Sequence, residues 1–206
     1  MGTYKAIIFD FGNVIINIDP ELTLKSLSDI SGKPLEKVRE KMEDSQLNRR
    51  YELGMFSDEE FREILRQTIG YPFSDREVDM AWNALLLDLP PHRISLILKL
   101  QSKYPVYLLS NTNSIHIKKC DTIFKDQFGI PNVKELFTKA FFSYEMELWK
   151  PDKRIYQAVL DDIDQLAKDV LFIDDNVANI ASAKEMGFQT ILNNPKKDDI
   201  INYFEI

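Results

Sequence analysis

The sequence predicts an α/β fold, a doubly wound parallel sheet with a helical domain inserted after its first strand. Three observations support this prediction. A short apolar run from Ala6 to Phe9 leads into Asp10, which is typical of a buried parallel strand. From residue 89 onward, strand and helix patterns alternate as in βαβ units. Between these parts, residues 17–88 show helical periodicity alone.

Helix start signals recur within residues 17–88. Four starts are expected, at Asp19-Pro20, at Pro34, at Ser57 with Glu60, and at Ser74 with Glu77. Proline is favoured at the first helical position, and a serine followed three residues later by a glutamate forms a capping box. Since a parallel crossover needs one helix, four extra helices indicate an inserted domain above the end of the first strand.

The remaining elements complete the sheet and its helices. Strands are predicted at residues 106–110, 139–143, 170–174 and 190–192, and helices from Pro91, Pro151 and Val177 and at the C-terminal end. The predicted domains are a core of residues 1–16 and 89–206 and a helical cap of residues 17–88. Hinges near residues 16–19 and 89–91 would let the cap move as a lid.

Composition excludes several classes of function. The 206 residues are 44% hydrophobic, which is enough for a well-buried core, and the net charge is −7. An acidic chain without a basic stripe does not suit nucleic acid or an anionic membrane. The single cysteine, Cys120, excludes an intrachain disulfide and fits a reducing compartment. With no signal peptide or membrane-spanning run, we expect a cytoplasmic protein, monomeric or weakly dimeric.

Polar residues occupy the ends of three predicted strands. Asp10 follows the first strand, Ser110 and Asn111 end the second, and Asp174 and Asp175 end the fourth. Open α/β sheets bind ligands beyond the carboxyl ends of their strands, so these residues are candidates for one site. Each group also has a purely structural interpretation. Asp10 could begin a turn, the residues after the second strand could cap a helix, and Asp174 and Asp175 could form a solvated acidic turn.

The charges at these positions predict a metal ion and an anionic substrate. The adjacent carboxylates of Asp174 and Asp175 repel each other unless a cation lies between them and Asp10, which indicates a hard divalent ion such as Mg²⁺. The hydroxyl and N–H groups after the second strand can hold phosphate oxygens. Lys150 lies at a helix start, which suits a cation only if it points into an anionic pocket; otherwise it is a surface lysine.

Other conspicuous residues are interpreted as structural. Tyr51 and Trp82 are expected in the cap core or at its rim, and Arg49 as a solvated charge. His92 and His116 are too few and too distant in sequence to indicate a metal site. We expect both to be structural or surface residues.

Together, the motifs resemble those of the haloacid dehalogenase superfamily, most of whose members are Mg²⁺-dependent phosphatases. The family signatures are an aspartate, a serine or threonine, a lysine before a helix and paired acids, and they match Asp10, Ser110, Lys150, Asp174 and Asp175 in order. The insertion resembles the helical-cap subclass. The longer strings around these motifs are similar to bacterial α-glucose-1-phosphate phosphatases and to the phosphatase domain of epoxide hydrolases.

The resemblance implies in-line attack by Asp10 on phosphorus, giving an aspartyl-phosphate that water hydrolyses. Lys150 and Ser110, with the backbone N–H of Asn111, would neutralise the phosphoryl oxygens. The implied site residues are Asp10, Lys150 and Ser110 for catalysis, Ser110, Asn111 and Lys150 for substrate binding, and Asp10, the carbonyl of Gly12, Asp174 and Asp175 for Mg²⁺. Asp174 would bind the ion directly or through water.

Gly12 departs from the family pattern. Most phosphatases of the family carry a second aspartate there, two residues after the nucleophile, which protonates the leaving alcohol and then activates water. Dehalogenases of the family also lack it, but they lack the paired acids as well, so Asp174 and Asp175 favour phosphoryl transfer. Without this acid, we expect esters with less basic leaving groups to react best, and glucose 1-phosphate to exceed glucose 6-phosphate.

Three functions are therefore considered. The first is a Mg²⁺-dependent phosphatase for a small phosphorylated metabolite, a sugar phosphate such as glucose 1-phosphate. The second is a 2-haloacid dehalogenase that uses the same aspartate without metal. The third is a non-catalytic binder of phosphorylated metabolites, which the glycine at position 12 makes credible.

Overall fold

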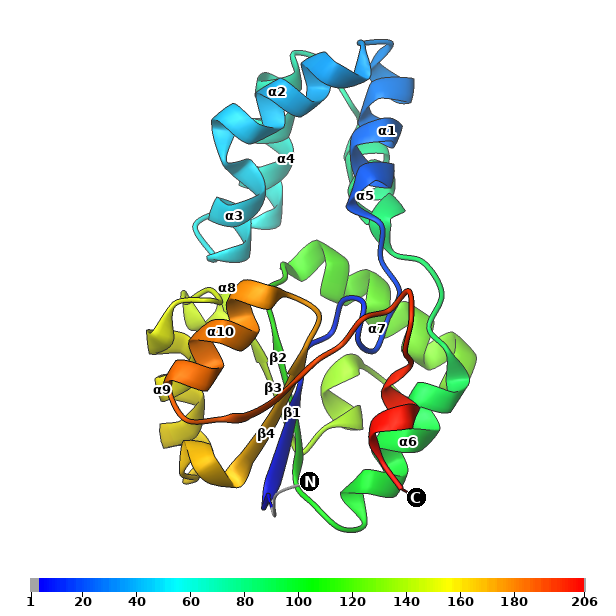
Figure 1. The fold of residues 1–206 in the computed structure, drawn as a ribbon. Coiled ribbons are helices and arrows are strands. Elements are labelled where there is room, and N and C mark those ends of the chain that lie inside the picture. Colours follow the sequence, from blue (N-terminus) through cyan, green and yellow to red (C-terminus); the bar gives the residue numbers. More distant parts are fainter. Residues whose placement is uncertain (1–3, 206) are drawn as a thin grey trace.

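The structure is a computed structural model that describes residues 4–205 (Figure 1). Its centre is a parallel five-stranded sheet in the order β3-β2-β1-β4-β5. The strands are β1 (Ala6–Phe9), β2 (Val106–Ser110), β3 (Lys139–Phe142), β4 (Val170–Asp174) and β5 (Gln189–Leu192). The predicted doubly wound α/β fold is confirmed.

β1 lies in the middle of the sheet and is buried along its whole length. Phe9 is in register with Leu108 of β2 and with Ile173 of β4. The backbone N–H of Asp10 donates to the carbonyl of Ile173 at 2.8 Å, which holds Asp10 beside the end of β4. Parallel pairing therefore brings polar residues from three distant segments to one edge of the sheet.

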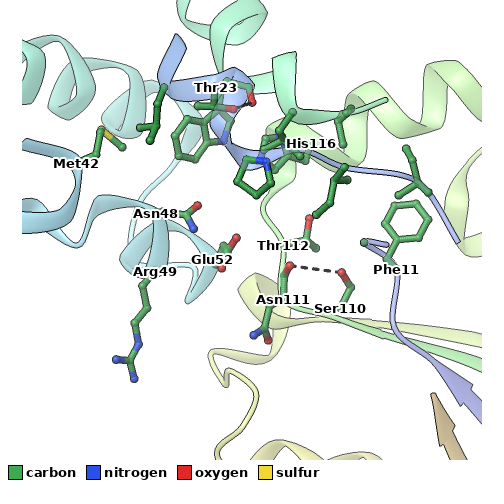
Figure 2. Close-up of a pocket in the computed structure, with 18 of the residues that line it drawn as sticks. Phe11, Thr23, Met42, Asn48, Arg49, Glu52, Ser110, Asn111, Thr112 and His116 are labelled. Atoms are coloured by element: carbon green, nitrogen blue, oxygen red, sulfur yellow. Dashed lines mark hydrogen bonds between the residues drawn. The ribbon is translucent and has the colours of Figure 1, made fainter. Parts of the chain in front are cut away.

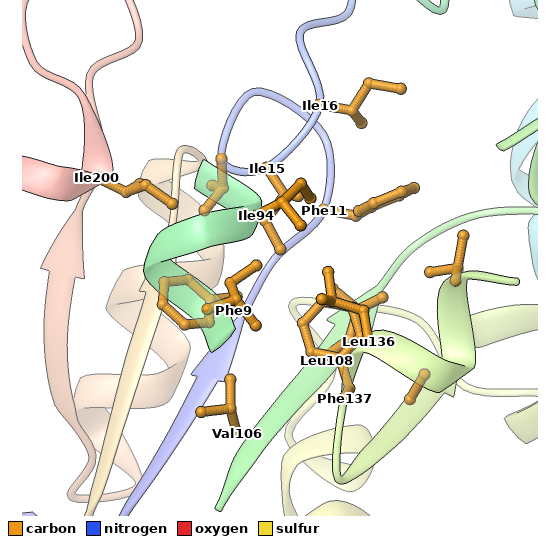
Figure 3. Close-up of a cluster of buried hydrophobic side chains, with 14 of the residues drawn as sticks. Phe9, Phe11, Ile15, Ile16, Ile94, Val106, Leu108, Leu136, Phe137 and Ile200 are labelled. Carbon is orange, nitrogen blue, oxygen red and sulfur yellow. The ribbon is translucent and has the colours of Figure 1, made fainter. Parts of the chain in front are cut away.

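Alternate residues of β1 point to opposite faces of the sheet, Ile7 and Phe9 into one apolar cluster and Ala6 and Ile8 into the other. The first face is covered by α6 (Pro91–Gln101) and α7 (Ser114–Phe128), and the second by α9 (Lys153–Ile163) and α10 (Val177–Glu185). Figure 3 shows the first cluster, where side chains of β1 and β2 pack against α6. Burial on both faces fixes the strands that carry the candidate site.

The segment between β1 and α6 consists of helices and the loops that join them, and its helices stand above the sheet (Figure 1). Its helices are α1 (Pro20–Ser31), α2 (Leu35–Ser45), α3 (Leu47–Glu52), α4 (Asp58–Ile69), α5 (Asp75–Trp82) and the 3₁₀ turn η1 (Asn83–Leu85). The predicted N-cap at Asp19 and both capping boxes are present. The short helix α3 has neither a cap nor a proline at its start and was not predicted.

Two chain segments connect this helical cap to the core and run antiparallel beside each other. Ile18 forms a bridge with Leu86, and the N–H of Asn17 donates to the carbonyl of Asp88 at 3.0 Å. The guanidinium of Arg93, on α6, reaches the side-chain oxygen of Asn17 at 3.0 Å. We propose that this paired linker, between the predicted core of residues 1–16 and 89–206 and the cap of residues 17–88, is where the cap would hinge.

Two strand boundaries differ from the prediction, since β5 begins one residue earlier, at Gln189, and β3 ends one residue earlier. The third strand was expected to reach residue 143, but Ser143 begins the short helix α8 (Ser143–Met146). The hydroxyl of Ser143 accepts from the N–H of Thr112 at 3.0 Å and donates to its carbonyl at 3.1 Å. These bonds replace strand pairing and hold the turn after β2.

Two helix predictions also need correction. The helix expected from Pro151 begins two residues later, after Asp152 as N-cap, because the preceding loop turns Lys150 inward. The expected C-terminal helix is a single 3₁₀ turn, η4 (Ile200–Tyr203). The other 3₁₀ turns are η2 (Val133–Leu136) and η3 (Ala167–Asp169). Among residues 4–205, no helix has the length and apolar character that crossing a membrane would require.

Candidate active site

Three carboxylates meet at the carboxyl edge of the sheet. Asp10 follows β1, and Asp174 and Asp175 end β4 and begin the loop to α10. One oxygen from each lies within 4.8 Å of the others. The structure thus brings together the acids that the sequence placed 164 residues apart. Such close carboxylates need a positive partner, since like charges at this distance repel strongly.

Lys150 supplies one such partner. Its ammonium lies 2.7 Å from Asp10 and 2.7 Å from Asp174, and it donates to the carbonyl of Leu109 at 2.8 Å. The side chain is 1% exposed, so the surface-lysine interpretation is excluded. Burial opposes the charge on this lysine, but the two carboxylates outweigh it and raise its pKa. Lys150 is therefore a charged group inside the site.

Asn111 fixes the position of Lys150. Its side-chain amide donates to the carbonyl of Lys150, and its side-chain oxygen accepts from the N–H of Lys150, both at 2.9 Å. The loop before α9 is in this way tied to the turn after β2. Asn111 thus acts on the site through its side chain as well as offering a backbone N–H.

Asp174 is fully buried and saturated with donors. Its two oxygens accept from Lys150, from the N–H of Asn176 at 2.8 Å and twice from the side-chain amide of Asn179, at 2.9 and 3.1 Å. A carboxylate has about four acceptor positions, and all are occupied here. Asp174 is therefore oriented by the protein more strongly than either of its neighbours.

Burial disfavours the charged forms of the other two acids, Asp10 and Asp175. Burial and the charges of Asp174 and Asp175 raise the pKa of Asp10, against the opposing effect of Lys150. Burial also raises the pKa of Asp175, although a hydrogen bond from Asn13 lowers it in part. Three ionised carboxylates against one ammonium leave a formal charge of −2. Hard oxygen donors at these separations fit a divalent cation such as Mg²⁺.

Asn13 fixes the loop after β1, which contains Gly12. Asn13 adopts a left-handed backbone with φ 55°, a conformation that asparagine tolerates better than most residues. Its side-chain oxygen accepts from the N–H of Ile18 at 3.2 Å, and its carbonyl accepts from Asn193 at 2.7 Å. Both contacts bind the loop that contains Gly12 to its surroundings.

Ser110 is buried at the end of β2. Its hydroxyl has one hydrogen bond within the described residues, to the carbonyl of Asn111 at 3.5 Å, which is too long to be strong. The N-cap expected as the alternative role of this motif falls instead on Asn113, whose side chain accepts from the N–H of His116 at 3.1 Å. The Ser110 hydroxyl can therefore bind another partner.

A cavity of about 530 Å³ opens between the cap and this edge of the sheet (Figure 2). From the core it is lined by Phe11, Gly12, Ser110 and Asn111, which adjoin the carboxylates. Its cap wall is formed by the apolar and polar side chains of Leu24, Met42, Asn48, Arg49, Glu52 and Trp82. A volume of this size suits a small metabolite.

Two charged residues of α3, Glu52 and Arg49, line the cavity. Glu52 ends α3, and its carboxylate accepts from the indole N–H of Trp149 at 2.8 Å. Arg49 lies over the ring of the same tryptophan at 5.0 Å and remains exposed, as expected of a solvated charge. Nothing in the sequence indicated Glu52, because the helix that carries it lacks a start signal.

The aromatic cap residues form both core and wall. Tyr51 and Trp82 are buried in the cap core, as expected, and Trp82 also lines the cavity. His116 is stacked on Trp82, with 5.5 Å between the ring centroids, and it also lines the cavity. It therefore has a structural contact and is also placed to contact a ligand. Burial lowers the pKa of His116 to about 3, which makes it a neutral ring.

Comparisons with known proteins identify a family and several similar proteins. Residues 4–187 match the family model described as haloacid dehalogenase-like hydrolase. The D-ribitol-5-phosphate phosphatase of Bacteroides thetaiotaomicron is 30% identical over 187 residues, which cover 90% of each chain. The sesquiterpene phosphatase astK of Aspergillus oryzae is 25% identical over 190 residues, covering 90% of this chain and 87% of that protein.

A solved structure is similar over the whole chain. It is a HAD family enzyme from Bacteroides thetaiotaomicron in complex with magnesium and inorganic phosphate. The TM-score is 0.86 at 34% sequence identity, and the match covers 98% of this chain and all of the other.

Proposed function

Because the chain belongs to the haloacid dehalogenase-like hydrolases, we propose that it is a Mg²⁺-dependent phosphatase for a small phosphorylated polyol or sugar. The observation that carries this proposal is the group of three carboxylates around a buried ammonium, beside a cavity of metabolite size. The metal-free dehalogenase of the same family has no use for the paired acids. Phosphoryl transfer explains them.

Magnesium is the cofactor, and the acids of the cluster would hold it. We assign direct contact to Asp10 and Asp175 and to the carbonyl of Gly12. Asp174 has its acceptor positions filled by protein donors, so we place its contact with the ion through water. The bound ion supplies positive charge that offsets the negative charge of the phosphoryl oxygens.

The chain's own residues carry out phosphoryl transfer. A carboxylate oxygen of Asp10 attacks phosphorus as the bond to the leaving oxygen breaks, and water later cleaves the aspartyl-phosphate. Lys150 orients Asp10 and balances charge, and the hydroxyl of Ser110 and the N–H of Asn111 bind phosphoryl oxygens. The raised pKa of Asp10 means that the ionised form is disfavoured in the metal-free cluster. A bound cation would lower this pKa and favour the ionised form.

The polar groups of the cavity favour a hydroxylated leaving group. The Nδ1 atom of His116 pairs with the side-chain oxygen of Asn83 at 3.0 Å, which leaves Nε2 as an acceptor on the neutral ring. Asn48 and Thr112 offer further donors and acceptors (Figure 2). D-Ribitol 5-phosphate, the substrate in the name of one relative, and glucose 1-phosphate are our two candidates.

An apolar phosphate ester is the competing substrate class. The cap wall includes Leu24, Met42 and Leu86, which could contact a hydrocarbon chain. One relative is named a sesquiterpene phosphatase. The two classes differ in which part of the wall they use, so a substrate panel separates them.

The test is phosphate release by the purified protein, with and without Mg²⁺, from ribitol 5-phosphate, glucose 1-phosphate, glucose 6-phosphate and a terpenyl phosphate. We expect Mg²⁺-dependent release with the highest kcat/KM on a polyol or sugar ester. A terpenyl ester hydrolysed best would overturn the substrate class. Fluoride release from fluoroacetate without metal would contradict the phosphatase proposal and favour a dehalogenase. Tight binding of these esters without turnover would contradict it in favour of a non-catalytic binder.

Metal binding should also stabilise the fold. Mg²⁺ at about one hundred times its Kd should raise the free energy of unfolding by about 2.7 kcal/mol, because the ion binds the folded state alone. Thermal unfolding with increasing Mg²⁺ measures this shift. Asp175→Asn should reduce it strongly, whereas Asp126→Asn, an exposed aspartate on α7, should leave it unchanged. Equal shifts in all three proteins would exclude the cluster as the metal site.

A further inference from the structure

Position 12 leaves the phosphatase chemistry without an acid beside the leaving group. A Cβ atom at Gly12 would lie 2.7 Å from Cδ1 of Ile18, so the space next to this glycine is filled by a side chain of the cap linker. Both residues line the cavity. A proton donor for the leaving oxygen must therefore come from another part of the cavity wall.

Two cap carboxylates line the same cavity, Glu43 and Glu52. Glu43 is exposed on α2, whereas Glu52 is partly buried at the end of α3. The indole N–H of Trp149 donates to one oxygen of Glu52 at 2.8 Å, and Trp149 directly precedes Lys150 in the chain. Glu52 is thus the cap carboxylate that is tied to the core beside the phosphoryl-binding residues.

Figure 2 shows Glu52 between Asn48, one turn earlier on α3, and Asn111 of the core. Its Oε2 atom accepts from the indole, so we assign the proton to Oε1. The groups that act on this carboxylate are the indole of Trp149, the side chain of Asn48 and the charge of Lys150. All three favour the ionised form, but burial outweighs them and raises the pKa of Glu52 to about 7.

We propose that Glu52 is the proton donor to the leaving oxygen, in place of the carboxylate that Gly12 lacks. This inference rests on the proposed phosphatase function and adds a catalytic residue to it. An acid whose pKa lies near the working pH is well suited to give and take a proton in turn.

The two half-reactions balance. As Asp10 attacks phosphorus, the bond to the leaving oxygen breaks, and that oxygen takes the proton of Glu52 and departs as an alcohol. The Glu52 carboxylate then takes a proton from water while the water oxygen attacks the aspartyl-phosphate. Phosphate leaves, Asp10 is free again and Glu52 is protonated, ready for the next cycle.

With Glu52 as acid, the expectation derived from Gly12 changes. The sequence predicted a steep dependence of rate on leaving-group basicity, because the leaving oxygen would depart without a proton. A donor in the cap should make this dependence shallow in the native protein and steep in its absence. Leaving-group dependence is therefore the quantity to measure.

The experiment compares the native protein with Glu52→Gln on aryl and primary alkyl phosphates that span a wide range of leaving-group pKa. Glutamine can still accept from Trp149, so the fold should be kept, as thermal unfolding would verify. We expect kcat/KM of Glu52→Gln to fall by about a hundredfold or more on alkyl esters and little on nitrophenyl phosphate. Glu40→Gln, which changes an exposed cap carboxylate on α2 outside the cavity lining, should behave like the native protein.

The pH profile gives a second readout. Since the protonated form is the donor, kcat/KM for alkyl esters should fall as pH rises above about 7, and nitrophenyl phosphate should lack this limb. Trp149→Phe removes a bond that favours the ionised carboxylate, so it should move the limb to higher pH. This second variant keeps the carboxyl group itself intact.

The outcomes are distinct. A uniform loss across all esters in Glu52→Gln, or a rise in KM confined to hydroxylated substrates, would overturn the proton-donor role and leave the phosphatase intact. A native protein that hydrolyses none of the esters with Mg²⁺ would overturn both the proposed function and this inference.

Discussion

Asp10→Asn should abolish phosphate release while leaving the protein folded. An amide does not attack phosphorus, so kcat should fall by roughly 10⁴-fold or more, the scale observed when a nucleophile is removed. The fold should survive, because an asparagine oxygen can still accept from Lys150, and replacing one of three crowded carboxylates relieves repulsion. Phosphate release at saturating substrate and Mg²⁺ measures the effect.

The control for this variant is Asp126→Asn, which changes an exposed aspartate of α7 in the same way. It should retain native activity and stability. Full activity in Asp10→Asn would show that another group attacks phosphorus. An unfolded Asp10→Asn would assign Asp10 a structural role instead.

Lys150→Ala should lower both the stability of the protein and its turnover. The buried ammonium pairs with both Asp10 and Asp174, so its removal leaves two buried carboxylates without a positively charged partner. The loss of one member of a buried ion pair costs about 3–5 kcal/mol of stability. Turnover per folded molecule should also fall, because nothing then orients Asp10 or balances the phosphoryl charge.

The stability loss should depend on pH. Without Lys150, burial alone acts on Asp10 and holds its folded-state pKa further above the unfolded value, so the folded state binds more protons. Stability is then present at low pH and is lost as pH rises through the folded-state pKa. Chemical denaturation at mildly acidic and mildly alkaline pH should show the larger deficit at the higher pH.

Lys153→Ala is the matched control, since this exposed lysine of α9 makes a surface ion pair with Glu185. It should change the free energy of unfolding by about 1 kcal/mol or less at either pH. A Lys150→Ala protein as stable as this control would contradict the charge balance described here. Native turnover per folded molecule would exclude Lys150 from the site.

Most of the fold could be predicted because its signals are local. The apolar run before Asp10 and the capping boxes at Ser57 and Ser74 depend on neighbouring residues, and the structure confirms them. The helix start at Lys153 and the strand end at Phe142 could not be predicted. They depend on contacts between distant segments, such as the inward turn of Lys150.

The candidate site also contains residues that the local sequence predicts and residues that it does not. Residues at strand ends, such as Asp10, Ser110 and Asp174, could be proposed from sequence because parallel strands end at one edge of the sheet. Glu52 could not, because its importance arises from Trp149, 97 residues later, and from a helix without a start signal. The bonds from Asn179 to Asp174 are likewise a product of the fold.

Detection of a phosphorylated Asp10 would test directly whether this aspartate is the nucleophile. The native protein would be mixed with its best substrate and Mg²⁺, quenched with acid during turnover and digested for mass spectrometry. We expect one phosphoryl group on the peptide that contains Asp10, and none in the Asp10→Asn variant. Rapid turnover with no phosphoryl group on that peptide at any quench time would contradict it.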